Sequence, residues 1–259
     1  MRISIVTPSF NQRQFIEHTA NSVLIQPKSL DLQWIVVDGG SSDGTVEFLK
    51  SLKDDRVRWT SEPDEGQADA VNKGLQSASG DICGWLNSDD TYAPRALETV
   101  VEAFENHPAA NWLIGRYEII DDAGQVIRSA IARYKERFLR RYSYSKLLRE
   151  NFVAQPAVFW RREAGERVGG LDRTLHYTMD YDFWLKLGRL SDPLIVDEVL
   201  AQFRLHHQSK SGQVNREQFD EGYRVACRYL GTDHLSRVAH RINVEKIVWA
   251  YRLMRRLGR

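Results

Sequence analysis

Short β-branched runs alternate with helical patterns through the first hundred residues, and this alternation limits the fold more than any other feature. One helical pattern runs to about Ile25, a second is capped by Ser42 or Asp43, and a third covers residues 67–78. Such alternation is typical of a parallel sheet with helices on both faces, so we expect an α/β fold. The predicted strands are Ile3–Thr7, Trp34–Asp38, Arg56–Ser61 and Ile82–Leu86.

The alternation loosens after about residue 110. Trp112–Ile120 and Val126–Ala132 are expected to pair as antiparallel strands around the turn DDAGQ. Further on we predict a strand at Ala157–Trp160, a helix at Asp182–Leu190 and one or two strands within Leu194–Leu205. The pattern is helical from residue 216 onward. With no repeat or obvious linker in 259 residues, we expect one compact domain with a helical tail.

Charge and cysteine usage exclude several classes of protein. The chain has 36 Lys and Arg against 35 Asp and Glu, and this net charge of +1 argues against a dedicated nucleic-acid binder. The two cysteines, Cys83 and Cys227, suit a reducing compartment and cannot build a disulfide framework. We expect no signal peptide, and no run of about 18 apolar residues predicts a membrane span. A cytoplasmic location is therefore expected.

Polar residues gather where three of the predicted strands end. Asp38 ends the second strand, Glu62 and Asp64 follow the third, and Asn87-Ser88-Asp89-Asp90 follows the fourth. In open α/β sheets, ligands bind in the crevice at the carboxyl ends of the strands. These acids are therefore expected to converge on one binding rim.

The segment WLNSDD is the sharpest of these signals. Two adjacent carboxylates at a strand end suit a divalent metal, either magnesium or manganese, which bridges them to substrate phosphates. We expect Asp90 to be the direct ligand and Asp89 to face a phosphate-bearing donor. The alternative is that both acids cap the helix that begins near Pro94, since acids favour helix starts.

The other acids have plain alternatives too. Asp38 is placed to accept hydrogen bonds from a nucleobase or a ribose, yet an Asp before Gly-Gly is also ordinary turn chemistry. TPSFN follows the first strand beside the same crevice, and Asn11 in it is also a candidate helix cap.

Five motifs in this chain resemble those of the family 2 glycosyltransferases, in order and spacing. They are TPSFN, VVDGGSSDGT, EPDEGQADAVNKG, ASGDICGWLNSDD and MDYDFWLKL, and the resemblance runs from about Ile3 to Ser211. It implies a GT-A fold, a nucleoside-diphosphate sugar donor and transfer with inversion. It also divides the chain into a donor half (1–107), an acceptor half (108–212) and a helical extension (213–259).

The resemblance carries roles to individual positions. The donor-binding residues that it implies are Thr7, Pro8, Asn11, Asp38, Glu62, Asp64, Asp69, Asn72 and Asp89, with Asp38 reading the base and Asp69 touching sugar hydroxyls. Asp90 would hold the metal. Many members carry an acid where this chain has Asn87, so metal binding would depend on fewer charges.

Asp180 matches the position of the family's catalytic base, which takes the proton from the acceptor hydroxyl. Members often have Glu-Asp there, whereas this chain has Met179-Asp180. Asp182 is the alternative base, and helix capping is the alternative role for both acids.

The segment FRLHHQSKSG looks like the family's loop near the diphosphate. His206 or His207 is expected at the metal or phosphate, and Arg204, Ser209 and Lys210 are expected to clamp the leaving group. A plain solvated loop fits the same composition.

Gln155, Trp160 and Tyr177 are the expected acceptor contacts, although aromatic residues at these spacings also suit a core. The basic stretch over residues 133–149 and the tail KIVWAYRLMRRLGR suggest peripheral contact with an anionic membrane at its inner face, against the alternative of a solvated helix face.

The sequence therefore predicts an inverting, metal-assisted glycosyltransferase, with a UDP-sugar favoured as donor. Its acceptor would be a saccharide or a lipid-linked saccharide of a cell-surface polysaccharide or glycolipid. Two alternatives stay open. A sugar-nucleotide nucleotidylyltransferase needs a Gly-rich loop after the first strand, which TPSFNQRQF lacks. A non-catalytic nucleotide- or sugar-binding module needs no base.

Overall fold

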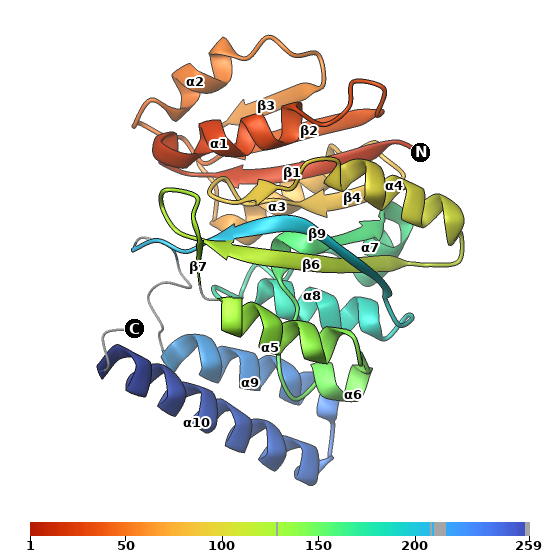
Figure 1. The fold of residues 1–259 in the computed structure, drawn as a ribbon, viewed down its shortest axis with the longest axis vertical. Helices are drawn as coiled ribbons and strands as arrows, with labels where there is room; N and C mark the ends of the chain where they lie inside the picture. Colours follow the sequence, from red (N-terminus) through yellow and green to blue (C-terminus); the bar gives the residue numbers. More distant parts are fainter. Residues whose placement is uncertain (128, 208, 210–215, 257–259) are drawn as a thin grey trace.

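A single mixed sheet runs through the protein, in the strand order β3-β2-β1-β4-β8-β6-β9-β5 with β7 paired to β6 (Figure 1). The computed structural model describes residues 1–127, 129–207, 209 and 216–256. The strands are β1 (Ile3–Ser9), β2 (Leu32–Asp38), β3 (Val57–Ser61), β4 (Ile82–Trp85), β5 (Thr91–Tyr92), β6 (Trp112–Ile120), β7 (Val126–Ile127), β8 (Val158–Arg161) and β9 (Leu194–Arg204).

Strands β3, β2, β1 and β4 are parallel, as the alternating pattern predicts. All seven residues of β1 are buried, because helices cover both faces of this half of the sheet. Strand β8 then runs antiparallel to both β4 and β6, and β5 runs antiparallel to β9. The sheet is therefore mixed, and β4 joins the expected donor half to β8 of the expected acceptor half. The division at residue 107 stays a prediction.

Helices lie on both faces of the sheet. Those on one face are α1 (Arg13–Leu24), α2 (Thr45–Ser51) and α4 (Ala96–Asn106). Those on the other are α3 (Gln67–Gln76), α5 (Ser129–Leu139), α6 (Tyr144–Leu147), α7 (Arg162–Val168), α8 (Met179–Gly188) and α9 (Arg216–Leu230). Helix α10 (His234–Arg256) packs on α9 at the end of the molecule farthest from β3 (Figure 1).

Alternation along the strands divides the core between these two faces. Ile5 of β1 packs toward α1 and α4, whereas Val6 packs toward α3, because successive strand residues point to opposite faces. Trp112 of β6 stacks on Trp184 of α8, with ring centroids 6.4 Å apart. Helix α3 approaches β1 so closely that a Cβ at Gly74 would lie 2.3 Å from a Val6 methyl group, so only glycine fits there.

Two of the predicted elements differ from the structure. The expected strand Val126–Ala132 ends at Ile127, because residues 129–139 form α5 instead of continuing the pair with β6. The predicted helix at Asp182 begins earlier, at Met179, so that Asp180 lies in its first turn. Among the described residues, no helix has both the length and the apolar character to cross a membrane.

Candidate functional site

A cleft of about 440 Å³ opens at the carboxyl ends of β1 and β4, where the crevice rule predicts a ligand site. Segments from seven parts of the chain line it. The lining residues are Pro8, Ser9, Phe10, Gln12, Asp64, Gly66, Gln67, Ala70, Trp85, Asn87, Ser88, Asp89, Gln155, His176, Tyr177, Met179, Asp180, Phe203, His206, Ser209 and Gln218. Residues predicted for five roles therefore meet here: donor, metal, base, acceptor and clamp positions.

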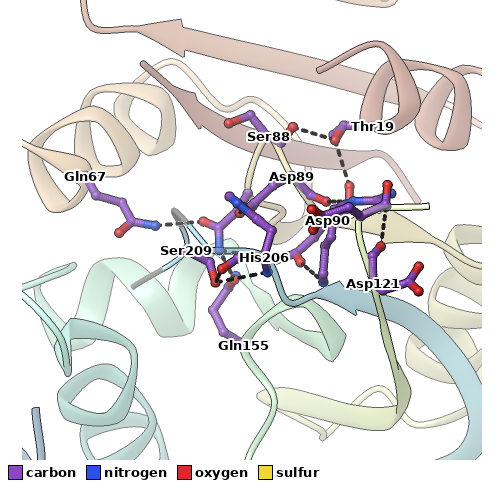
Figure 2. A network of polar contacts seen from close by, with 12 residues as sticks. Thr19, Gln67, Ser88, Asp89, Asp90, Asp121, Gln155, His206 and Ser209 are labelled. Atoms are coloured by element: carbon purple, nitrogen blue, oxygen red, sulfur yellow. Dashed lines mark hydrogen bonds and ion pairs between the residues drawn. The ribbon is translucent and has the colours of Figure 1, made fainter. Parts of the chain in front are cut away.

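Asp89 and His206 face each other in this cleft. The Asp89 carboxylate follows β4, His206 follows β9, and their Oδ2 and Nε2 atoms lie 3.0 Å apart (Figure 2). Ser209 closes the turn after β9, because its hydroxyl donates to the His206 carbonyl at 2.8 Å. Of the two candidate histidines, His206 contacts the Asp89 carboxylate and lines the cleft, and its contact with a metal or phosphate stays a prediction.

Asp90, the expected metal ligand, points away from the cleft and is completely buried. Its Oδ1 accepts a hydrogen bond from the Arg204 backbone N–H at 2.8 Å, and its Oδ2 accepts one from Asn87 at 3.3 Å. Burial, and then the neighbouring Asp89 carboxylate, raise the pKa of Asp90 well above its ordinary value. In this structure Asp89 lines the cleft and Asp90 is buried beneath it, so the expected direct contact of Asp90 with a metal is not part of this arrangement.

Arg204 also lies beneath the cleft rather than in it. Only 3% of its surface is exposed, and its guanidinium donates to the backbone carbonyls of Asp89 and Asp121, each at 2.8 Å. Because its Nε and Nη1 atoms donate to these carbonyls, Arg204 supports the loop after β4. This corrects its expected role as a clamp on the leaving group. Lys210, the other basic residue of that clamp, lies outside the described residues.

Asn87 is the centre of a neutral hydrogen-bond network at the floor of the cleft. Its Oδ1 accepts from Gln67 Nε2 and from Trp85 Nε1, each at 2.8 Å. Its Nδ2 donates to Gln155 Oε1 at 3.0 Å and to Asp90. An aspartate could accept the first two bonds but not donate the last two. The departure from the acid common at this position is therefore built into the local packing.

Asp180 lies on the opposite wall of the cleft, in the first turn of α8. Burial raises the pKa of its carboxyl to about 6, although hydrogen bonds from the Tyr181 N–H and the Asn151 side chain oppose the rise. A carboxylate with such a pKa is suited to accept a proton near neutral pH. Asp182, the alternative base, is buried against Tyr229 and Lys186 at 2.7 and 2.8 Å and does not line the cleft.

Some of the expected donor residues in the first two motifs line the cleft, and others hold the loops around it. Pro8 lines the cleft, whereas Thr7 is buried and accepts a hydrogen bond from Trp34 Nε1 at 2.9 Å. Asn11 accepts one from the Ser42 N–H at 2.9 Å and so ties the loop after β1 to the loop after β2.

Asp38 is completely buried and accepts hydrogen bonds from the Gly40 and Ser41 N–H groups and the Ser61 hydroxyl, at 3.1, 2.9 and 2.7 Å. Asp38 therefore acts here as a turn residue. Its expected contact with the base is not part of this arrangement.

The EPDEGQADAVNKG motif divides in the same way. Asp64 lines the cleft, and Glu62 is exposed on the far side of the loop, 3.6 Å from Lys73. Asp69 is held by ion pairs with Lys73 at 3.2 Å and Arg173 at 3.1 Å. The Glu65 N–H, followed by these two cations, holds the pKa of Asp69 below its ordinary value.

Asn72 is a structural anchor. Its side-chain amide donates to the Leu171 carbonyl at 2.9 Å and accepts from the Leu171 N–H at 3.0 Å, which fixes the loop before α8 on α3. Asp69 and Asn72 thus support the cleft but do not line it.

Of the expected acceptor contacts, Gln155 and Tyr177 line the cleft, while Trp160 does not. Trp160 is 1% exposed and packs edge-on against Phe183, with ring centroids 5.1 Å apart. Strand β8 turns this side chain toward the core beneath α8, so its expected role in stacking on an acceptor sugar is wrong.

Several lining residues were not predicted. Phe10 is 59% exposed beside the cleft although it is a large apolar side chain. A phenylalanine directly after a strand end in TPSFN was a signal that could have identified it. Gln67, His176 and Gln218 had no comparable signal, because glutamine and histidine are ordinary loop and helix-surface residues.

The donor set of Asp89 and His206 fits a divalent cation. Magnesium and manganese are often held by one or two carboxylates and completed by substrate phosphates, and a neutral imidazole is a frequent metal ligand in proteins. Among the described residues, no three His, Cys, Asp or Glu side chains form a ready-made metal cluster. Substrate phosphates and water would complete the coordination of a cation held by Asp89 and His206.

Comparison with known proteins gives the following matches. The sequence profile of Glycosyl transferase family 2 matches residues 4–169. An uncharacterized glycosyltransferase of Mycobacterium tuberculosis (strain H37Rv) is 29% identical over 204 residues, which cover 78% of this chain and 74% of that protein.

Two solved structures resemble the fold. Staphylococcus aureus TarS 1–349 in complex with UDP-GlcNAc has a TM-score of 0.68 at 17% identity, over 90% of this chain and 68% of that one. The mannosyltransferase PcManGT from Pyrobaculum calidifontis, in complex with GDP-Man and Mn²⁺, has a TM-score of 0.68 at 19% identity. That match covers 88% of this chain and 64% of PcManGT.

Proposed function

The chain belongs to glycosyl transferase family 2 and has the GT-A fold, and from this premise we propose that it is an inverting, metal-assisted sugar transferase. One observation carries the proposal: Asp89 with His206 and the carboxylate of Asp180 line the same cleft. A single displacement needs a site for the departing diphosphate and a base for the attacking hydroxyl. The cleft offers side chains suited to both.

We propose that the nucleoside binds between Phe10 and Asp64. The Phe10 ring is exposed and lies against Gly39, where a Cβ would come within 3.3 Å of it and within 2.7 Å of the Asp64 carboxylate. An exposed aromatic ring beside an acidic side chain suits a base that stacks and a ribose that donates hydrogen bonds. We favour a UDP-sugar as donor, as in the TarS complex, with GDP-mannose as the alternative that PcManGT binds.

The diphosphate is proposed to lie against Asp89 and His206. A divalent cation bound there (manganese or magnesium) would neutralise the charge that develops on the leaving group. The manganese in the PcManGT complex supports this choice. Ser209 orders the turn that carries His206, and the buried Asp90 and Arg204 hold the loop that carries Asp89.

In the chemical step, the Asp180 carboxylate takes the proton of the acceptor hydroxyl. The hydroxyl oxygen forms a bond to the anomeric carbon on the face opposite the diphosphate. The bond between that carbon and the diphosphate oxygen breaks, and its electron pair leaves with the nucleoside diphosphate. The sugar therefore changes anomeric configuration once.

The acceptor is proposed to enter beside Gln155 and Tyr177, which line the cleft next to Asp180. A saccharide or lipid-linked saccharide of a cell-surface polysaccharide or glycolipid fits this class of enzyme. Leu235, Val238 and Ile242 form an exposed apolar stripe on α10, with 85%, 57% and 50% of their surfaces accessible. Two features support peripheral contact with the inner face of an anionic membrane: this apolar stripe on α10 and the basic side chains on α5.

The first experiment is a thermal-shift panel of UDP, GDP, CDP and TDP, each with and without manganese. A ligand at about 100 times its dissociation constant adds roughly 2.7 kcal/mol of stability. We expect one nucleotide, UDP first, to raise the melting temperature by several degrees only when manganese is present. No shift with any nucleotide would remove the donor site from this cleft. Sedimentation with vesicles that contain anionic lipid tests the membrane contact separately.

A further inference from the structure

Glu221 of α9 is a buried carboxylate that binds the segment leading to the proposed base. Its Oε1 accepts hydrogen bonds from the N–H groups of Tyr177 and Thr178, each at 2.8 Å, and from the Thr178 hydroxyl at 2.9 Å. Its Oε2 accepts one from the His176 N–H at 3.1 Å. Only 6% of its surface is exposed. Burial alone would raise its pKa, but the bonds from Tyr177, His176 and Thr178 outweigh it and hold the pKa below the ordinary value.

The bound segment runs directly into the cleft wall. His176, Tyr177, Met179 and Asp180 all line the cleft, and Thr178 is the residue before the first turn of α8. The Thr178 side chain does not cap α8 itself, because its hydroxyl donates to Glu221. Three successive N–H groups that converge on one carboxylate form an anion-binding nest, and a negative charge is favourable at a helix start. Glu221 is therefore the group that fixes the path of the chain into Asp180.

We propose that Glu221 is a positioning residue for Asp180, which makes α9 a working part of the active site. The inference depends on the proposed function, in which Asp180 is the base. Displacement of a catalytic group by about 1 Å can cost on the order of a hundredfold in rate. Four hydrogen bonds from residues 176–178 to one side chain restrain the segment that leads directly into Asp180. Glu221 lies beyond residues 4–169, the region that the family profile matches.

A purely structural role of α9 can be tested separately from the positioning of Asp180 by Glu221. Tyr229, also on α9, joins α9 to α8 through a hydrogen bond from its hydroxyl to Asp182 at 2.7 Å. That contact lies one turn farther along α8 and does not touch the segment 176–178. The Tyr229→Phe variant therefore weakens the packing of α9 on α8 while leaving the support of Asp180 unchanged.

The test compares Glu221→Gln with Tyr229→Phe and Asp180→Asn in the full chain with manganese. The donor is UDP-GlcNAc or GDP-mannose, whichever stabilises the protein more, and turnover is the release of nucleoside diphosphate. For Glu221→Gln we expect kcat to fall on the order of tenfold to a hundredfold, with KM for the donor and the nucleotide-induced thermal shift unchanged. Tyr229→Phe should keep kcat within twofold of the wild type. Thr178→Val, which removes only the hydroxyl donor, should give a smaller fall and carries the test if Glu221→Gln does not fold.

The outcomes distinguish the positioning role of Glu221 from the assignment of Asp180 as the base. A Glu221→Gln enzyme with wild-type kcat, beside an inactive Asp180→Asn enzyme, overturns the positioning role alone. Equal losses of kcat in Glu221→Gln and Tyr229→Phe also overturn it, because packing of α9 would then explain both. An Asp180→Asn enzyme that retains turnover overturns the base assignment itself.

Discussion

The imidazole of His206 lies 3.0 Å from the carboxylate of Asp89, although 117 positions separate them in the chain. The two side chains come from the loops after β9 and β4, and both face the cleft. Asp90, adjacent to Asp89, faces the opposite way and is buried. This difference between two neighbouring acids leads to the first prediction.

Asp89→Asn should abolish the part of the nucleotide-induced thermal shift that depends on manganese, because it removes the carboxylate that faces the diphosphate. Asp90→Asn should keep that shift, since an amide oxygen still accepts the hydrogen bond from the Arg204 N–H. Thermal shifts with UDP and manganese measure both variants. Loss of the shift in Asp90→Asn with retention in Asp89→Asn would restore the order that the sequence predicted.

Asp180→Asn should lower turnover about 10²- to 10⁴-fold, which is the usual contribution of a general base. The amide keeps the shape of the side chain but cannot accept the proton of the acceptor hydroxyl. Nucleotide binding should be unchanged, since Phe10, Asp64 and Asp89 are untouched. Product release and the nucleotide-induced thermal shift measure the two properties in parallel. A binding module without catalysis would show no turnover in the wild type either.

The rate should rise with pH and reach half its maximum near pH 6. The pKa of Asp180 is raised to about 6 by burial, and only the deprotonated carboxylate accepts a proton, so activity is lost below that pH. Asn151→Ala removes a hydrogen bond that favours the charged form and should move the midpoint to higher pH. A profile of kcat/KM from pH 5 to 8, which reports the pKa of the free enzyme, measures both enzymes. A midpoint that moves to lower pH in Asn151→Ala would contradict this account.

Asn87→Asp should lower the free energy of unfolding by about 1–3 kcal/mol, the usual cost of unsatisfied buried polar groups. The carboxylate cannot donate to Gln155 or Asp90, and it adds a negative charge next to Asp90. Asn11→Asp is the matched control, because the Asn11 oxygen only accepts a hydrogen bond and aspartate preserves it. Urea unfolding at pH 7 measures the pair. Equal stability of the two variants would mean that the Asn87 network does not contribute as described.

Trp160→Ala should cost about 3–5 kcal/mol of stability, as truncation of a buried tryptophan usually does. Tyr177→Ala, at the rim of the cleft, should change stability little and instead raise KM for the acceptor. Urea unfolding and acceptor saturation curves distinguish the two. If Trp160→Ala kept its stability and only weakened acceptor binding, the residue would belong to the acceptor site after all.

Local patterns predicted much of the fold and the place of the cleft. Runs such as Ile3–Thr7 and Trp34–Asp38 are strands because buried parallel strands need uninterrupted apolar residues on both faces. The carboxyl ends of parallel strands share one edge of the sheet, so the sequence by itself predicts that the motif after β4 lies at the cleft. Asp180 is predicted differently, from its position in the motif MDYDFWLKL that resembles the family, since the helix predicted from the local pattern begins only at Asp182.

The direction of each side chain at the cleft was decided only by tertiary structure. In Asn87-Ser88-Asp89-Asp90, the backbone turn and the N–H of Arg204, 114 positions away, draw Asp90 inward and leave Asp89 outward. Strand β8 turns the Trp160 side chain into the core. Glu221 binds residues 176–178, the segment before Asp180, from a helix more than 40 positions later in the chain. Local sequence patterns determine which elements form, because propensity and periodicity are local. Which acid, aromatic ring or carboxylate serves the site depends on partners that only the folded chain brings within hydrogen-bond distance.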